Sequence, residues 1–172
     1  ASVWPFFTAE RFGWSPAMIG VSLTIYGVCF AIVQGVLVRP AIKLFGENKT
    51  VIIGFGFEMF GLVLMSVITN GTILLGLIPI AALGVVGQPA LQAILSKGTS
   101  DDSQGILQGV LASLSAVSMI IAPISMTWVF SVFTDDSALM YYPGAPFAVS
   151  ASLLAIGLYI FVQKGDDPQK QS

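Results

Sequence analysis

Five long apolar stretches constrain the fold of this chain more than any other feature of its sequence. They cover residues Ala17–Val38, Val51–Thr69, Thr72–Leu95, Gly105–Phe133 and Tyr142–Val162. An α-helix rises about 1.5 Å per residue, so each stretch is long enough to cross a hydrocarbon layer of roughly 30 Å. We therefore predict an all-α fold, a polytopic bundle of membrane-spanning helices.

The composition excludes most soluble classes of protein. Hydrophobic residues make up 55 % of the 172 and charged residues 9 %, whereas a soluble domain carries about 25 % charged residues. The net charge is −2 and no run of basic residues occurs, so a nucleic-acid partner is not expected. Histidine is absent and Cys29, the one cysteine, lies in an apolar stretch. We therefore expect no metal site, no cofactor and no enzymatic activity.

The two ends of the chain differ from the apolar stretches. Residues Ala1–Thr8 read as the last two turns of an apolar helix that begins upstream. On this interpretation the chain is the C-terminal piece of a longer protein. We expect a transmembrane bundle over residues 1–164, followed by a polar tail over residues 165–172.

The charges between the apolar stretches predict an orientation. If the five stretches alternate in direction, one side of the membrane receives Arg39, Lys43, Lys49, Lys97, Lys164 and Lys170. The other side receives Arg11, together with Asp135 and Asp136. Lysine and arginine gather on the cytoplasmic side of membrane proteins, so the first group and the C-terminal tail are predicted to be cytoplasmic.

Local signals predict where helices begin, bend and approach one another. Ser15 before Pro16 is typical of a helix N-cap. Pro123 lies inside the fourth stretch, where it predicts a kink, a tilt or an early start of the helix. Gly105 and Gly109 form a Gly-x-x-x-Gly step, which favours helix packing over ligand contact. Similar roles are predicted for Gly20 with Gly27, for Gly54 with Gly61 and for Gly84 with Gly87.

Glu58 is the one ionisable residue well inside an apolar stretch. It lies seven residues from the start of the second stretch, or about 10 Å along a helix. A carboxylate at this depth costs on the order of 2.5–3.5 kcal/mol, so it is expected to face the bundle interior. It could be a structural acid bonded to a neighbouring helix. We favour a proton-carrying carboxyl, because no basic residue in the stretches can pair with it.

Amide side chains are the other polar groups in the stretches. They are Gln34, Gln88, Gln92 and Gln108. Gln88 and Gln92 share one helical face beside Pro89, and a proline loosens a helix there. These amides could contact a ligand or make interhelical hydrogen bonds, which are worth roughly 0.6 kcal/mol each. The sequence does not separate these two alternatives.

Three segments together resemble one family. They are Arg11–Ser15 with Ile19 and Gly20, Leu44–Glu47 with Lys49, and Pro89–Ala93 continuing to Gln104–Gly105, Leu107–Gly109 and Pro123. They are similar to the C-terminal half of tetracycline-type drug/proton antiporters of the major facilitator superfamily. The likeness covers nearly the whole chain, and the third segment is the most specific.

The resemblance implies a fold and an activity. It implies a bacterial inner-membrane transporter of twelve helices in two six-helix halves, whose central cavity opens alternately to each side. This chain would supply the end of helix 7 and helices 8–12. Its partners would be the N-terminal six-helix half, protons, an amphipathic drug and the lipid bilayer.

The resemblance also implies roles for single residues. Glu58 matches an acidic residue of the ninth helix that takes part in proton coupling. Gln34 matches a glutamine of the eighth helix that contacts drug, and Phe30 stands where the tetracycline pumps tend to have histidine. The last difference argues against tetracycline itself as the substrate.

We therefore predict a proton-coupled drug exporter. Glu58 would exchange the proton, and the substrate path would be lined by Phe30, Gln34, Gln88, Gln92 and Gln108. The main alternative is a non-transporting membrane scaffold in which Glu58 bonds a neighbour. A self-assembled pore is weaker, because no stretch carries a continuous polar stripe.

Overall fold

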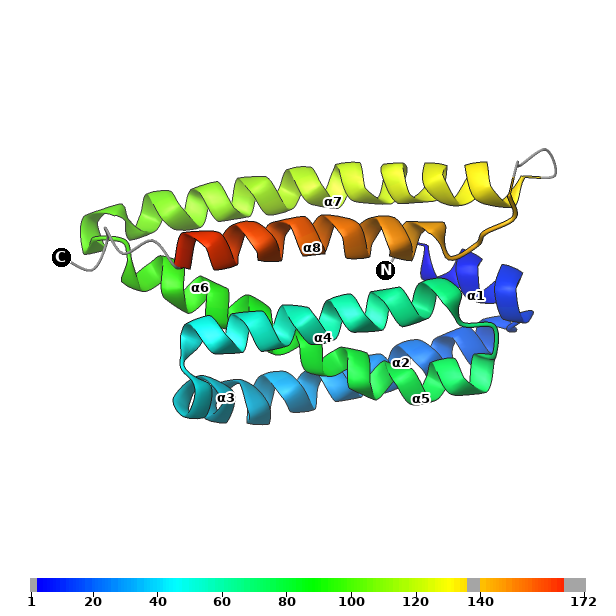
Figure 1. Cartoon of the computed structure of the whole chain (residues 1–172), viewed down its shortest axis with the longest axis horizontal. Coiled ribbons are helices and arrows are strands. Elements are labelled where there is room, and N and C mark those ends of the chain that lie inside the picture. The colour runs from blue at the N-terminus through cyan, green and yellow to red at the C-terminus, as the bar shows by residue number, and fades with distance from the viewer. Residues whose placement is uncertain (1–2, 136–139, 166–172) are drawn as a thin grey trace.

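A computed structural model describes residues 3–135 and 140–165 of the chain, and these residues form helices and connecting turns without a strand (Figure 1). The α-helices are α1 (Trp4–Phe12), α2 (Pro16–Ile32), α3 (Val38–Phe45), α4 (Glu47–Val67), α5 (Gly71–Ala82), α6 (Gly87–Lys97), α7 (Gln104–Thr134) and α8 (Ala145–Gly165). The remaining helical segments are a π-helix, η1 (Val33–Leu37), and two 3₁₀-helices, η2 (Leu83–Val86) and η3 (Asp101–Ser103).

Five of the helical stretches are long and apolar enough to cross a membrane. They are Pro16–Phe45, Glu47–Val67, Gly71–Lys97, Gln104–Thr134 and Ala145–Gln163. The prediction of an all-α bundle of membrane-length helices is confirmed. The first and third of these stretches are composite, because η1 joins α2 to α3 and η2 joins α5 to α6. α7 passes through Pro123 as one uninterrupted α-helix.

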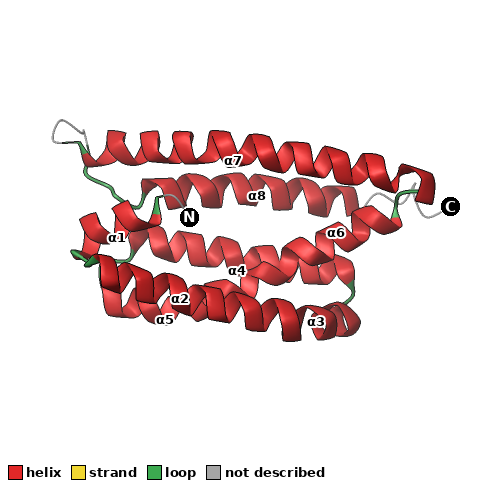
Figure 2. Cartoon of the chain, turned by 180° about the vertical axis from the view of Figure 1, so that it is seen from behind, coloured by secondary structure: helices red, strands yellow, loops and turns green. Residues whose placement is uncertain are grey.

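The long helices lie side by side along the long axis of the molecule. In both views α7 and α8 form one side, α2 and α5 form the other, and α4 lies between them (Figure 2). α4 packs against α5, η2, α6 and α8 and is therefore the central helix of the bundle. α7 has no buried residue, and among the described elements it contacts α8 most extensively.

The structure confirms one predicted helix start and shows that other helices extend further than predicted. Ser15 is the N-cap of α2, and its side chain accepts a hydrogen bond from the Met18 backbone N–H at 3.3 Å. The sequence predicts a connection over residues 39–50, between the first two stretches. In the structure only Gly46 is non-helical there, and its φ of 77° suits a residue without a Cβ. α1 continues past Thr8 to Phe12 and ends at Gly13, which has φ of 64°. Gly46 alone separates α3 from α4, whereas Gly13 is followed by two more non-helical residues, Trp14 and Ser15, before α2 begins.

Four glycines allow α4 to approach its neighbours closely. A Cβ built on Gly61 would lie 3.0 Å from the Ala81 Cβ, and one on Gly84 would lie 2.7 Å from the Glu58 Cβ. A Cβ on Gly54 would meet the backbone of Gly87, and one on Gly87 would lie 3.1 Å from the backbone N of Phe55. In contrast, a Cβ built on Gly20, Gly27, Gly105 or Gly109 would have no atom of the described residues within 4 Å. The packing role predicted for these four glycines is therefore not fulfilled by the described part of the chain.

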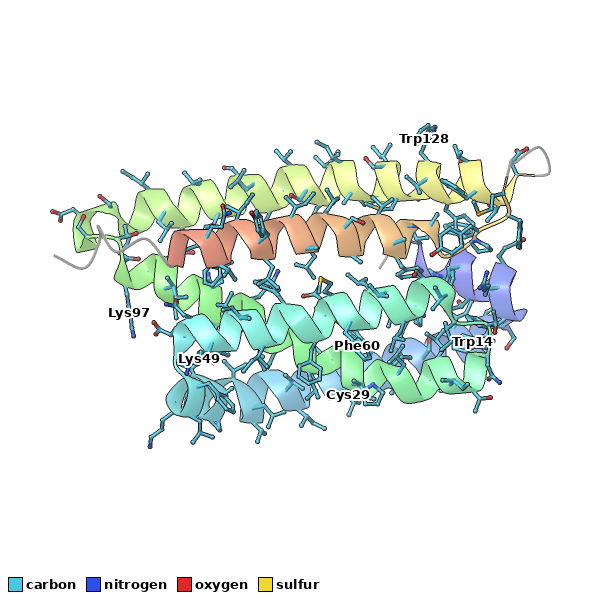
Figure 3. The ribbon with its side chains drawn as sticks, viewed as in Figure 1. Trp14, Cys29, Lys49, Phe60, Lys97 and Trp128 are labelled. Carbon is cyan, nitrogen blue, oxygen red and sulfur yellow. The ribbon has the colours of Figure 1, made fainter. Side chains whose placement is uncertain are left out.

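The described basic residues lie at the two ends of the bundle, in the two groups that an alternating topology predicts. Figure 3 shows Lys49 and Lys97 at one end and Trp14 near the other. Lys97 forms an ion pair with Glu47 at 2.6 Å, which joins the end of α6 to the start of α4. α3, with Arg39 and Lys43, lies at the same end (Figure 1). The Lys164 side chain, Lys170 and Asp136 fall outside the described part of the chain.

Polar contacts join three segments at the end that carries Arg11. Arg11 donates hydrogen bonds to the carbonyls of Ile68 (3.1 Å) and Val67 (3.4 Å), which are left without helical partners where α4 ends. Tyr141 donates to Glu10 Oε1 at 2.7 Å. This hydrogen bond, more than burial, raises the pKa of Tyr141, so the contact is present at neutral pH and is lost as the pH rises through that pKa.

Replacing Arg11 by methionine is expected to lower the free energy of unfolding by about 1–2 kcal/mol, because the two carbonyls of α4 lose a charged donor. Thermal unfolding of the purified protein, followed by circular dichroism, measures the change. Arg39→Met is the matched control, since Arg39 is exposed and makes no hydrogen bond or ion pair with the described residues. Equal stability of the two variants would show that the Arg11 contacts contribute nothing.

Candidate functional site

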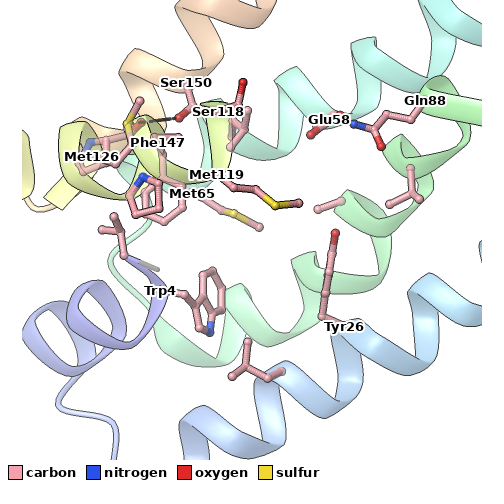
Figure 4. Close-up of a pocket in the computed structure, with 18 of the residues that line it drawn as sticks. Trp4, Tyr26, Glu58, Met65, Gln88, Ser118, Met119, Met126, Phe147 and Ser150 are labelled. Atoms are coloured by element: carbon pink, nitrogen blue, oxygen red, sulfur yellow. Dashed lines mark hydrogen bonds between the residues drawn. The ribbon is translucent and has the colours of Figure 1, made fainter. Parts of the chain in front are cut away.

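A large cavity lies between the two sides of the bundle. Its volume is about 1040 Å³, and its walls come from α1, α2, α4, α5, α6, α7 and α8. Most of the residues that line it are apolar. A smaller number of polar side chains project into it, and Figure 4 shows the most prominent of them.

Glu58 lines this cavity from the middle of α4. The Glu58 side chain is solvent-exposed in this chain. It points into the cavity and not toward a neighbouring helix (Figure 4). Its backbone is fixed by Gly84, since a Cβ on Gly84 would lie 2.8 Å from the Glu58 N. Among the described residues, no lysine or arginine forms an ion pair with Glu58. The backbone and Cβ of Glu58 are therefore held in position, and its carboxylate has no countercharge among the described residues.

Gln88 lies opposite Glu58, near the start of α6. Figure 4 shows the Gln88 amide and the Glu58 carboxylate directed toward one another across the cavity. Gln88 follows the 3₁₀ segment η2, where the helical hydrogen-bonding pattern changes, and precedes Pro89. The irregular backbone at this depth lines the cavity, which is where a membrane protein tolerates it.

Tyr26 is a third polar residue at this end of the cavity, and sequence reasoning missed it. It projects from α2, and its hydroxyl points into the cavity (Figure 4). It also packs against Phe30 one turn along α2, with ring centroids 6.2 Å apart. A tyrosine in the middle of an apolar stretch has a hydroxyl that needs a partner, and this signal could have identified it.

The opposite end of the cavity is aromatic and sulfur-rich. Trp4, Met65, Met126 and Phe147 project into it, and Met119 lies between the two ends (Figure 4). The Trp4 indole donates a hydrogen bond to Ser22 Oγ at 2.9 Å, which fixes the ring. Thioether and aromatic side chains adapt to apolar groups of different shape. The cavity thus has one polar end and one adaptable apolar end.

The structure does not gather all of the predicted site residues. Glu58 and Gln88 line the cavity, whereas Phe30, Gln34, Gln92 and Gln108 are absent from its lining. Gln92 is exposed one turn beyond Gln88, about 6 Å nearer the end of α6. Gln34 is half-buried in the π-helix η1, and Gln108 is exposed on α7. A contact between these four residues and substrate remains a prediction.

Comparisons with known proteins agree on one family. The sequence model of the Major Facilitator Superfamily matches residues 1–172. The chain is 35 % identical over 158 residues to the class C tetracycline resistance protein of Escherichia coli, covering 92 % of this chain and 39 % of that protein. It is 37 % identical over 131 residues to the class G protein of Vibrio anguillarum, covering 76 % of this chain and 33 % of that protein. No solved structure matches the chain.

These matches cover only part of the length of each relative. The class H tetracycline resistance protein of Pasteurella multocida is 33 % identical over 156 residues, which is 91 % of this chain and 38 % of that protein. The chain thus spans between a third and two fifths of the length of the curated relatives it matches. About three fifths or more of each relative therefore has no counterpart in these 172 residues.

Proposed function

Because the chain belongs to the Major Facilitator Superfamily, we propose that it forms half of a proton-coupled exporter of amphipathic small molecules. It acts with an N-terminal six-helix half, and the cavity between the halves opens alternately to the two sides of the membrane. The relatives named tetracycline resistance proteins support a drug as the exported compound.

The observation that carries this proposal is the carboxyl of Glu58 in the cavity. The described residues that line the cavity include no lysine or arginine, and a carboxylate in a membrane protein is costly when it has no partner. A proton or a bound substrate relieves that cost, so the two compete for one group. Such competition makes the binding of drug release a proton, which is the requirement for exchange of drug against protons.

The proposed orientation places the end of the bundle with Lys49 and Lys97 in the cytoplasm. The α8 end and the C-terminal tail then lie in the cytoplasm too. The exposed face of α7, with Gly105 and Gly109, is available to pack against the N-terminal half. The chain acts as a transporter and not as an enzyme.

Drug uptake into inverted membrane vesicles tests the proposal. Vesicles that contain this chain with its N-terminal half are expected to accumulate drug when a pH gradient is imposed, and a protonophore should stop the accumulation. Vesicles with the 172-residue chain alone are expected to show no uptake, because one half cannot alternate access. Uptake by the chain alone would contradict the need for a second half. No gradient-driven uptake of any drug by the assembled protein would favour the scaffold alternative.

A further inference from the structure

Three unpaired basic residues form a patch where α3 turns into α4. Arg39 and Lys43 are four residues apart on α3, so they lie on the same side of that helix. Lys49 lies in the first turn of α4. All three are exposed, and none makes a hydrogen bond or an ion pair with the described residues. Glu47, the acidic residue next to them in sequence, already pairs with Lys97. This basic patch (Arg39, Lys43 and Lys49) therefore carries three positive charges that the described chain does not neutralise.

The backbone under the basic patch is held in place by a buried hydroxyl. Thr50 is buried, and its Oγ1 lies 2.7 Å from the Gly46 carbonyl oxygen and 3.1 Å from the Ala41 carbonyl oxygen. The Gly46 N–H donates a hydrogen bond to the Ile42 carbonyl at 2.9 Å. On the inward side of α3, Val38 and Ile42 belong to an apolar cluster with residues of η2. The three basic side chains therefore project from a fixed turn.

The length of the first membrane stretch places the patch at the depth of lipid headgroups. The stretch Pro16–Phe45 has 30 residues, which corresponds to about 45 Å at 1.5 Å per residue, whereas the hydrocarbon layer is about 30 Å thick. Measured from Pro16, the hydrocarbon layer ends near residue 36. Arg39 and Lys43 follow about 5 Å and about 10 Å further along the helix. Both side chains are long enough to reach a phosphate in the headgroup layer.

An exposed apolar surface continues from the patch toward the centre of the membrane. Ile32 and Val36, which precede α3 along the same stretch, are each more than half exposed. Leu44, next to Lys43, is also largely exposed. Positive charge at headgroup depth beside an apolar surface at hydrocarbon depth matches the two parts of an anionic phospholipid, a negative headgroup and acyl chains.

We propose that the basic patch binds the headgroup of an anionic phospholipid, whose acyl chains lie along Ile32 and Val36. The guanidinium of Arg39 suits two phosphate oxygens at once, and Lys43 and Lys49 act as point charges beside it. A zwitterionic phospholipid has the same phosphate, but its ammonium group adds a positive charge that the patch repels. This site is separate from the cavity, and the inference does not depend on the exported compound or on its coupling to protons.

A lipid is favoured over a protein segment as the occupant because of charge and position. The lipid supplies the negative charge that the three basic residues lack. The helix face proposed above to pack against the N-terminal half belongs to α7, on the other side of the bundle from α2 and α3 (Figure 2). Each basic residue near an anionic lipid surface strengthens binding about fivefold. Loss of two of the three residues should therefore remove most of the preference for an anionic headgroup.

Quenching of a fluorophore attached beside the patch tests the proposal. The purified transporter, assembled from this chain and its N-terminal half, carries Leu44→Cys as its only cysteine, with Cys29→Ser, and the fluorophore is attached at position 44. Phosphatidylglycerol and phosphatidylcholine with identical chains, each spin-labelled near the headgroup, are the two probes in mixed micelles. Phosphatidylglycerol is expected to quench at an at least about fivefold lower concentration than phosphatidylcholine.

Matched charge substitutions assign the preference to the patch. Arg39→Gln combined with Lys43→Gln is expected to reduce the preference for phosphatidylglycerol to less than about twofold. Arg11→Gln removes one positive charge at the opposite end of the bundle and should leave the preference unchanged. Quenching by phosphatidylcholine should be equal in all variants, which checks that they fold alike.

The remaining outcomes would overturn the proposal. Equal quenching by the two lipids, or a preference that survives the Arg39 and Lys43 substitutions, would show that the patch does not select an anionic headgroup. Quenching by neither lipid would show that another part of the transporter covers α3. Millimolar inorganic phosphate at constant ionic strength is expected not to compete, because it has no acyl chains. Competition by phosphate would show a site for free anions instead of a lipid site.

Discussion

Replacing Glu58 by glutamine is expected to reduce drug-dependent proton release by the assembled transporter to background. Glutamine has nearly the same shape as glutamate and cannot carry the proton, so exchange loses its coupling group while the packing of α4 is kept. Glu58 lies next to Gly84 through its backbone and Cβ, and these atoms do not change in the variant. A pH-sensitive dye in weakly buffered vesicles measures the protons released when drug is added.

Two other carboxylates provide controls for this experiment. Glu10→Gln and Glu47→Gln change residues near the two ends of the bundle that are absent from the cavity lining. Both variants are expected to keep drug-dependent proton release. Size-exclusion chromatography checks that all three variants fold. Release that survives Glu58→Gln would place the proton site in the N-terminal half and would remove Glu58 from the mechanism.

Helix positions could be predicted from the sequence because they depend on local properties. Length and apolar composition are sufficient to identify membrane-length helices, and the Ser15 cap depends only on adjacent residues. Gly46 shows the limit of this reasoning. The charged and polar residues of the segment 39–50 resemble a loop, yet a single glycine with positive φ turns the chain there and the flanking residues stay helical.

The residues that line the cavity could be predicted from the sequence less well than the positions of the helices. A helix that is apolar on all sides has no periodic pattern to show which face points inward. Gln88 and Gln92 share one face of α6, but only Gln88 is at the depth of the cavity. Gln34 lies in the π-helix η1, which changes the rotation of the helix locally, and no pattern in the sequence indicates this segment.

Close helix contacts were predicted correctly only where the partner helix belongs to this chain. Gly84 with Gly87, and Gly54 with Gly61, contact neighbouring segments as expected. The same role was predicted for Gly20 with Gly27 and for Gly105 with Gly109, but a Cβ at any of these four would have no described atom within 4 Å. A small-residue motif indicates that a helix can be approached closely, but the approaching helix is determined by the tertiary structure.

Replacing Gly54 by alanine is expected to be the most damaging single-methyl change in α4. The added Cβ would meet the backbone N of Gly87 and lie 2.7 Å from its Cα, and Gly54 is buried. A backbone atom cannot move aside by changing a rotamer, so α4 and α6 must separate. Overpacking typically costs about 1–3 kcal/mol, and we expect a loss in the free energy of unfolding at the upper end of this range.

Gly56→Ala provides the control for this expectation because it adds the same methyl group two residues along the same helix. Gly56 has no atom within 4 Å of the position of an added Cβ. Alanine there should stabilise α4 by up to about 1 kcal/mol, because it favours the helix more than glycine does. Thermal unfolding of the two variants in detergent therefore should shift in opposite directions. Shifts of the same sign would show that the contact between α4 and α6 is looser than the structure indicates. In that case the position of Glu58 relative to Gln88, which this contact determines, would be adjustable rather than fixed.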